Sequence, residues 1–123
     1  VAAGMTSIRP GARASDIHRT MCEVVVQEGL TAVSPEGHGI GLEMRDYPII
    51  APPNGRDLAD ECFSVAADLT LEPGMVINLE AAQFRPGTAS LQCERSFVVT
   101  TTGVRDLIPQ DRDRIRVNSS GDR

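Results

Sequence analysis

The residues with the clearest chemical potential are Glu80 and Glu94, which a predicted β-hairpin places opposite each other. Strand-like residues 76–84 and 89–100 flank an Arg-Pro-Gly-Thr segment, and a Pro-Gly pair between two such segments predicts a tight turn. A turn centred on Gly87 pairs Glu80 with Glu94. Like charges directly opposite each other on adjacent strands, with Cβ atoms about 4.5 to 5.5 Å apart, are destabilising. A shared proton, an arginine or a metal ion bridging the carboxylates would relieve this repulsion.

The alternative is an ordinary solvent-facing hairpin in which Arg85 or Arg95 pairs with either glutamate. The neighbouring residues argue against it, because Ile-Asn-Leu precedes Glu80 and Phe-Val-Val follows shortly after Glu94. Buried carboxylates without partners are costly. We therefore favour the metal ion.

His38 is the third candidate ligand, because three glycines surround it in the segment Gly37-His38-Gly39-Ile40-Gly41. Glycines clear side chains from around the imidazole and permit unusual backbone angles, although they could equally serve a turn. One imidazole and two carboxylates suit Mn, Fe, Co or Zn. These three ligands are too few for a two-metal centre, which uses additional carboxylates. The other histidine, His18, lies on the polar flank of a predicted helix and is expected to be an exposed or half-buried surface residue rather than a ligand.

One main helix, a glycine-rich loop and a strand meander are expected to position these residues. The helix spans residues 15–27, with Ser15 as its N-cap and Gly29 as its stop, and the loop spans residues 31–41. The remaining expectations are a helix end at 1–8, short strands at 31–33, 63–65 and 68–70, a weak strand at 42–51, short helical character at 56–62, a turn at 72–74 and a third meander strand at 104–108. Together they predict an α+β fold in which helices cover an antiparallel meander sheet.

Length and composition fit a single globular domain, since the chain has 123 residues of which 41% are apolar. We expect the domain to span residues 1–112 and residues 113–123 to form a polar, flexible tail. A net charge of −5 without a basic cluster argues against nucleic-acid binding. Three cysteines without CxxC spacing predict reduced thiols. No apolar run could span a membrane and no leader-like start is evident, so we expect a cytoplasmic protein.

Three motifs occur in a recognisable order: GHGIGLEMRDYP, then LEPGMVINLE, then CERSFVVTTTG. They resemble the three C-terminal motifs of the pita-bread metallopeptidases, a family that includes methionine aminopeptidase, aminopeptidase P, prolidase and the non-peptidase creatinase. The segment IRPGARASDIHRTMCEVVVQEGL is similar to the turn and helix that precede them. The resemblance covers about residues 4–109, and it implies the C-terminal half of a pita-bread fold.

The resemblance also implies roles for the candidate residues. The family site holds two divalent ions, bound by two Asp, one His and two Glu. By this resemblance His38 is a ligand, Glu80 is a ligand that also accepts and donates a proton, and Glu94 bridges both ions. The family's two aspartates lie well upstream of the GHGIG motif, so we expect an N-terminal half to supply them. That half is either the preceding part of a longer chain or a second, associated chain. The resemblance further implies a homodimer.

Two positions depart from the family pattern. Arg45 stands where peptidases of the family usually have a second histidine, and Gln92 stands where proline-specific members often have an arginine. The leading interpretation is an Xaa-Pro peptidase with a metal-activated water. One alternative is a creatinase-like enzyme whose Arg45 binds the carboxylate of a small non-peptide substrate. The other is a metal-free protein-binding module.

Overall fold

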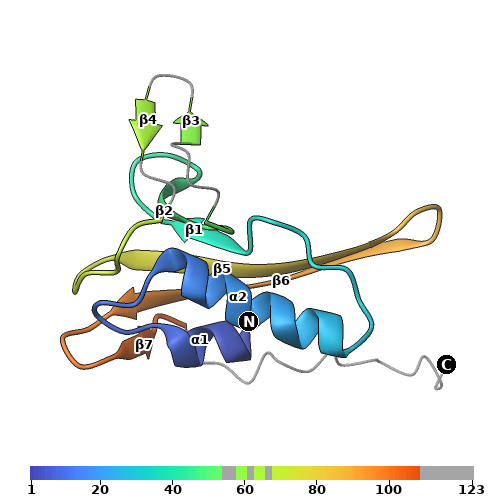
Figure 1. Ribbon diagram of the computed structural model, residues 1–123, viewed down its shortest axis with the longest axis horizontal. Helices are drawn as coiled ribbons and strands as arrows, with labels where there is room; N and C mark the ends of the chain where they lie inside the picture. Colours follow the sequence, from blue (N-terminus) through green and yellow to red (C-terminus); the bar gives the residue numbers. More distant parts are fainter. Residues whose placement is uncertain (54–57, 61–62, 66–67, 109–123) are drawn as a thin grey trace, which may run out of the picture.

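The computed structural model describes residues 1–53, 58–60, 63–65 and 68–108. A five-stranded antiparallel sheet in the order β2-β1-β5-β6-β7 carries two helices on one face (Figure 1). Strands β3 and β4 form a separate two-stranded ribbon. The elements are α1 (Ala2–Ser7), α2 (Ala14–Gln27), β1 (Gly37–Gly39), β2 (Asp46–Ile50), β3 (Leu58–Asp60), β4 (Phe63–Val65), β5 (Val76–Arg85), β6 (Ala89–Val99) and β7 (Val104–Asp106).

The predicted meander is confirmed. Strands β5, β6 and β7 are consecutive antiparallel neighbours, and Glu80 pairs with Glu94 as the sequence predicts. Gly87 lies at the turn with a positive φ of 73°, a conformation that glycine adopts without steric cost. The hairpin extends well past the ends of the helices (Figure 1).

The prediction of a loop over residues 31–41 is wrong for residues 37–39, which include His38. Residues Gly37–Gly39 form β1, which lies between β2 and β5, while residues 31–33 form no strand. A Cβ on Gly37 would overlap the Asn78 carbonyl oxygen, and one on Gly39 would overlap the Tyr47 carbonyl oxygen. The glycines therefore allow close approach of neighbouring strands, and they place His38 inside the sheet.

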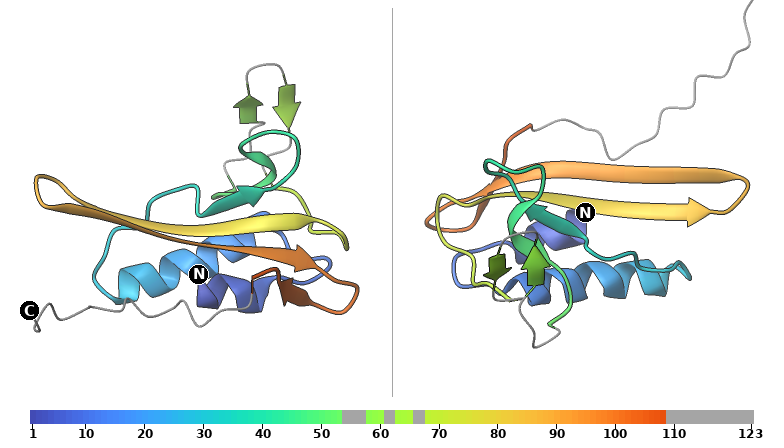
Figure 2. Two further views of the ribbon diagram at one scale, coloured as in Figure 1. Left: turned by 180° about the vertical axis from the view of Figure 1, so that it is seen from behind. Right: turned by 90° about the horizontal axis from the view of Figure 1, so that it is seen from above.

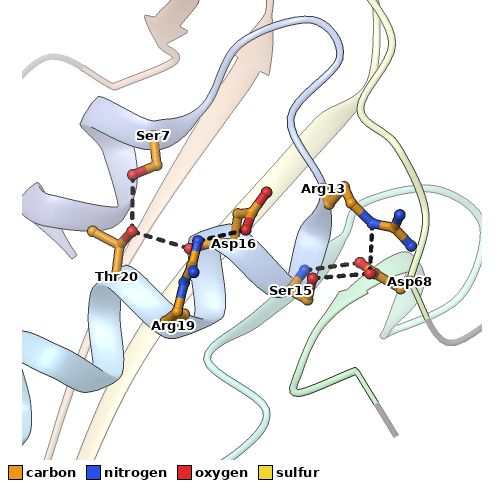
Figure 3. Close-up of polar contacts among 7 residues, drawn as sticks. All are labelled: Ser7, Arg13, Ser15, Asp16, Arg19, Thr20 and Asp68. Carbon is orange, nitrogen blue, oxygen red and sulfur yellow. Dashed lines mark hydrogen bonds and ion pairs between the residues drawn. The ribbon is translucent and has the colours of Figure 1, made fainter. Parts of the chain in front are cut away.

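The main helix is confirmed, but its predicted N-cap is not. Arg13 is the N-cap of α2, and the buried Ser15 lies inside the helix. The Asp68 carboxylate replaces the cap by accepting hydrogen bonds from the Ser15 N–H (3.0 Å) and hydroxyl (2.9 Å), as Figure 3 shows. The Arg13 guanidinium also donates to it, at 2.7 Å. Gly29 follows the helix end with a φ of 72°.

The helices lie along one face of the sheet (Figure 2), and the buried apolar side chains of the described residues form one core cluster. Ile17 and Met21 of α2 contribute to it from one side, and Ile77, Leu79 and Phe97 contribute from the other. Side chains alternate between the faces of a strand, so this packing turns Asn78 and Glu80 to the opposite face.

The remaining predictions divide between the described and undescribed parts of the chain. Residues 58–60 form β3 rather than helix, whereas 56–57, 61–62 and the predicted tail at 113–123 lie outside the described residues. The described helices are all too short or too polar to cross a membrane.

Candidate metal centre

The predicted ligands come together on the sheet face opposite the helices. His38 of β1 pairs with Asn78 of β5, and Glu80 pairs with Glu94 of β6. All four side chains line one open pocket of about 450 Å³. The other residues around this pocket are Ile40, Met44, Arg45, Gln92 and Ser96. The structure thus places both glutamates and His38 at one site.

Glu80 is the residue of this pocket that most needs a positively charged partner. The residue is 6% exposed, and its Oε1 atom is buried without a hydrogen-bond partner in the described part of the chain. The Arg45 guanidinium makes a long ionic contact with this atom, with Nη2 3.8 Å from Oε1. Glu94, by contrast, is exposed. The expectation that both carboxylates lie in an apolar setting therefore holds for Glu80 alone.

A neutral amide lies between the two carboxylates. Gln92 Nε2 donates to Glu80 Oε2 and to Glu94 Oε1, both at 2.6 Å. Asn78 Nδ2 donates to the other oxygen of Glu94 at 3.0 Å, and Ser96 in turn donates to Asn78 at 3.2 Å. Arg95, one of the arginines considered as a partner, donates to Asp106 and lies over the Phe97 ring. The amide relieves part of the repulsion, a solution that the sequence did not indicate.

His38 is half-buried and held by its own strand. Its Nδ1 atom lies 2.8 Å from the Gly39 carbonyl oxygen, which can only accept a hydrogen bond. This contact favours the tautomer with the proton on Nδ1, so that Nε2 keeps its lone pair. Metal-binding histidines commonly use such a backbone carbonyl to fix the ring.

These donors fit a divalent transition metal. An imidazole nitrogen and carboxylate oxygens form the mixed ligand set that such ions accept. A cation would also satisfy Oε1 of Glu80, a buried atom that has no hydrogen-bond partner among the described residues and lies 3.8 Å from the Arg45 guanidinium. The residues that line this pocket include no aspartate. The pocket lining could accordingly supply one wall of a metal site.

Arg45 lies at the rim of the same pocket. Its side chain is 54% exposed, so the guanidinium is open to solvent on one side. The adjacent Asp46 instead accepts hydrogen bonds from the backbone N–H groups of Tyr47 (2.8 Å) and Leu42 (3.1 Å). These bonds hold the pKa of Asp46 below its usual value. Asp46 thereby orders the loop that carries Arg45.

His18 is half-buried, which is within the expected range, but it has partners that the sequence did not indicate. Its side chain is only 14% exposed and contacts the Glu36 carboxylate, and Cys22 lies beside both. The i, i+4 spacing of His18 and Cys22 on one helix is the sequence signal that could have indicated this cluster. Glu36, 18 residues from His18, could not be found that way.

Most of the sequence matches a known protein family. A family model for metallopeptidase family M24 matches residues 1–101. The chain belongs to this family. Its fold is that of the pita-bread peptidases, since structures of this kind superpose on most of the chain.

Three similar proteins illustrate the relationship. An Xaa-Pro dipeptidase from Lactobacillus helveticus is 27% identical over 113 residues, covering 90% of this chain and 27% of that protein. The crystal structure of dipeptidase PepE from Mycobacterium ulcerans has a TM-score of 0.73 at 27% identity, covering 89% of this chain and 26% of that one. Prolidase from Pyrococcus furiosus has a TM-score of 0.73 at 22% identity, covering 90% and 30% respectively, and shows the fold alone. The chain spans about a quarter of the length of the relatives it matches.

Proposed function

We propose that this chain carries one wall of the catalytic centre of a divalent-metal-dependent peptidase acting on Xaa-Pro peptides. The observation that carries the proposal is the buried Oε1 of Glu80, which has no hydrogen-bond partner among the described residues and belongs to a residue that lines one pocket with His38 and Glu94. Membership of family M24 and the similarity to an Xaa-Pro dipeptidase support the substrate class.

Each of the three ligands has a distinct part in this proposal. His38 would bind through Nε2, Glu80 through its orphaned oxygen and Glu94 through its exposed carboxylate. Divalent ions such as Mn, Co, Zn or Fe, when bound, would make a water molecule nucleophilic near neutral pH and polarise a scissile carbonyl. Glu80 would take the proton released by that water and return it to the leaving amine. Its burial would keep bulk water from competing for that proton.

We further propose that residues which do not line this pocket complete the metal site. Two aspartates from an N-terminal half would supply the remaining ligands of a two-ion centre, which needs more carboxylates than this pocket offers. A homodimer and a cytoplasmic location belong to the same proposal.

A second candidate function rests on Arg45. A half-exposed guanidinium at the rim of the pocket could bind a carboxylate with two parallel hydrogen bonds. A creatinase-like enzyme acting on a small non-peptide carboxylate would use it in this way. The metal-free binding module is disfavoured, because all three expected ligands are present and Glu80 has an unsatisfied oxygen.

The deciding experiment uses the protein together with the upstream half, loaded with Mn²⁺. We expect hydrolysis of Xaa-Pro dipeptides, and Glu80→Gln should lower kcat by about 10² to 10⁴. Glu72→Gln, the same change at an exposed turn, should leave kcat unchanged. Turnover of only non-peptide carboxylates, abolished by Arg45→Ala, would favour the second candidate. Elemental analysis showing no bound metal would overturn both.

A further inference from the structure

A second cluster of metal-type ligands lies where α2 approaches the segment before β1. His18 and Cys22 are four residues apart on α2, and Glu36 directly precedes β1. The ligand atoms of these three residues all lie within 4.8 Å of one another. None of the three lines the pocket of His38, Glu80 and Glu94.

The sulfur–nitrogen distance in this cluster matches one edge of a tetrahedral site, whereas the contacts of Glu36 are shorter than such edges. Zn–S bonds of about 2.3 Å and Zn–N bonds of about 2.05 Å place sulfur and nitrogen ligands roughly 3.6 Å apart. Cys22 Sγ lies 3.6 Å from the ring nitrogens of His18 and 3.1 Å from Glu36 Oε1. The other oxygen of Glu36 contacts His18 Nδ1 directly. Small adjustments would therefore admit one ion between the three donors.

The surroundings also favour a cation. The Glu36 side chain is 5% exposed, and a buried carboxylate favours a positively charged partner. Burial, followed by the hydrogen bond to Glu36 and the charge of Glu36, raises the pKa of the Cys22 thiol to about 12. Without a cation the thiol stays protonated and donates to Glu36. His18 and Cys22 also line an open pocket of about 610 Å³, which gives an ion a route to the cluster.

We propose that His18, Cys22 and Glu36 form a second metal site, which binds one zinc-like divalent ion with a water molecule as fourth ligand. Binding replaces the Cys22 proton by the ion and releases that proton to solvent, so that thiolate, imidazole and carboxylate become the ligands. The ion joins α2 to the strand edge that carries His38. It is a structural ion, distinct from those of the proposed catalytic centre, and it does not depend on the proposed function.

Cobalt absorption tests this site selectively. The probe is Co²⁺ alone, titrated into the full chain carrying Cys62→Ser and Cys93→Ser, so that Cys22 is the only thiol. We expect a thiolate-to-cobalt charge-transfer band that saturates at one equivalent. The centre of His38, Glu80 and Glu94 contains no sulfur and cannot give this band. His38→Ala should therefore leave it unchanged, whereas His18→Ala should weaken apparent Co²⁺ affinity at least about tenfold.

Adding Cys22→Ser to this background should abolish the band. A band that persists in that variant, or affinity unaffected by His18→Ala, would overturn the proposal. If Cys22→Ser fails to fold, zinc X-ray absorption on the Cys62→Ser/Cys93→Ser chain decides. We expect one sulfur neighbour at about 2.3 Å. A zinc environment without sulfur would show that the cluster is only a hydrogen-bonded group.

Discussion

At the scale of single residues, the Gln92 amide nitrogen stands between two carboxylates that would otherwise repel. Its position is occupied by an arginine in the proline-specific pattern described above, so a neutral donor here leaves the carboxylates with their full negative charge. Each carboxylate retains an attraction for a cation. Gln92 therefore stabilises the pocket without adding a positive charge that would compete with a bound cation.

Replacing Gln92 by leucine should destabilise the chain by about 1 to 2 kcal/mol, because the buried Glu80 loses its amide donor. The free energy of unfolding, measured by urea denaturation, checks this. Gln27→Leu makes the same change at an exposed position of α2 and should have little effect. Saturating Mn²⁺ should reduce the Gln92→Leu deficit, and a deficit unaffected by Mn²⁺ would argue against a cation at Glu80.

These residues also show which contacts could be predicted from the sequence and which could not. The pairing of Glu80 with Glu94 was predictable, because turn position and strand alternation set hairpin register. The bridge made by Gln92 depends on a side-chain conformation, which no local pattern encodes. The contact of His18 with Glu36 joins two elements whose packing emerges only in the complete fold.

At the scale of elements, β1 is the least predictable and the most consequential. Three residues with two glycines carry no alternating pattern, so the sequence indicated a loop. The structure makes this segment a strand because neighbouring backbones lie too close for any side chain at Gly37 or Gly39. The position of His38 beside Glu80 and Glu94 depends on that close approach of the strands.

Gly39→Ala should destabilise the chain by about 2 to 3 kcal/mol, since its methyl group would displace the Tyr47 carbonyl and separate β1 from β2. Gly103→Ala is the matched control. A Cβ there meets nothing within 4 Å, so it should be neutral or slightly stabilising. Thermal unfolding measures both. Equal melting temperatures for the two variants would contradict the packing described for β1.

The start of α2 provides a second test at this scale. Asp68→Ala should cost about 1 to 2 kcal/mol, because the Ser15 N–H loses its acceptor. The surface pair of Asp16 and Arg19 is the control, and Asp16→Asn should cost only about 0.5 kcal/mol.

The contribution of Asp68 should also depend on pH. Burial would raise its pKa, but the bonds from Ser15 and Arg13 lower the pKa below its usual value. A lowered folded-state pKa means that the ionised form stabilises the fold above the unfolded pKa of about 3.9. That stability is lost as pH falls through the folded pKa. The difference in unfolding free energy between wild type and Asp68→Asn should therefore be full at neutral pH and shrink below about pH 4. A constant difference would contradict this account.

At the scale of the whole molecule, packing is concentrated at one end of the long hairpin. The helices cover the part of β5 and β6 that contains Ile77 and Phe97, whereas the tip extends past them with Phe84 and Leu91 exposed (Figure 2). Local stability should follow this distribution, since few buried contacts hold the tip.

Hydrogen exchange measured by NMR should reveal that gradient. Backbone amides of β5 and β6 near the turn, in residues 82–92, should exchange at least about tenfold faster than those of Ile77 and Phe97. The comparison is internal, because both groups lie in the same two strands. Uniform protection along the hairpin would mean that the tip is stabilised by contacts beyond this chain, such as a second copy.

The carboxylate that caps α2 has a consequence for the order of folding. Asp68 reaches Arg13 and Ser15 from 55 and 53 residues away along the chain, and Leu71 exchanges backbone hydrogen bonds with Gly11 and Ala12 beside it. During synthesis the start of α2 therefore lacks its stabilising anion until Asp68 has emerged from the ribosome. Contacts of such long sequence separation slow folding, because the intervening loop must close before they form. We expect α2 to dock stably only after the later segment that carries Asp68 and Leu71 has been made.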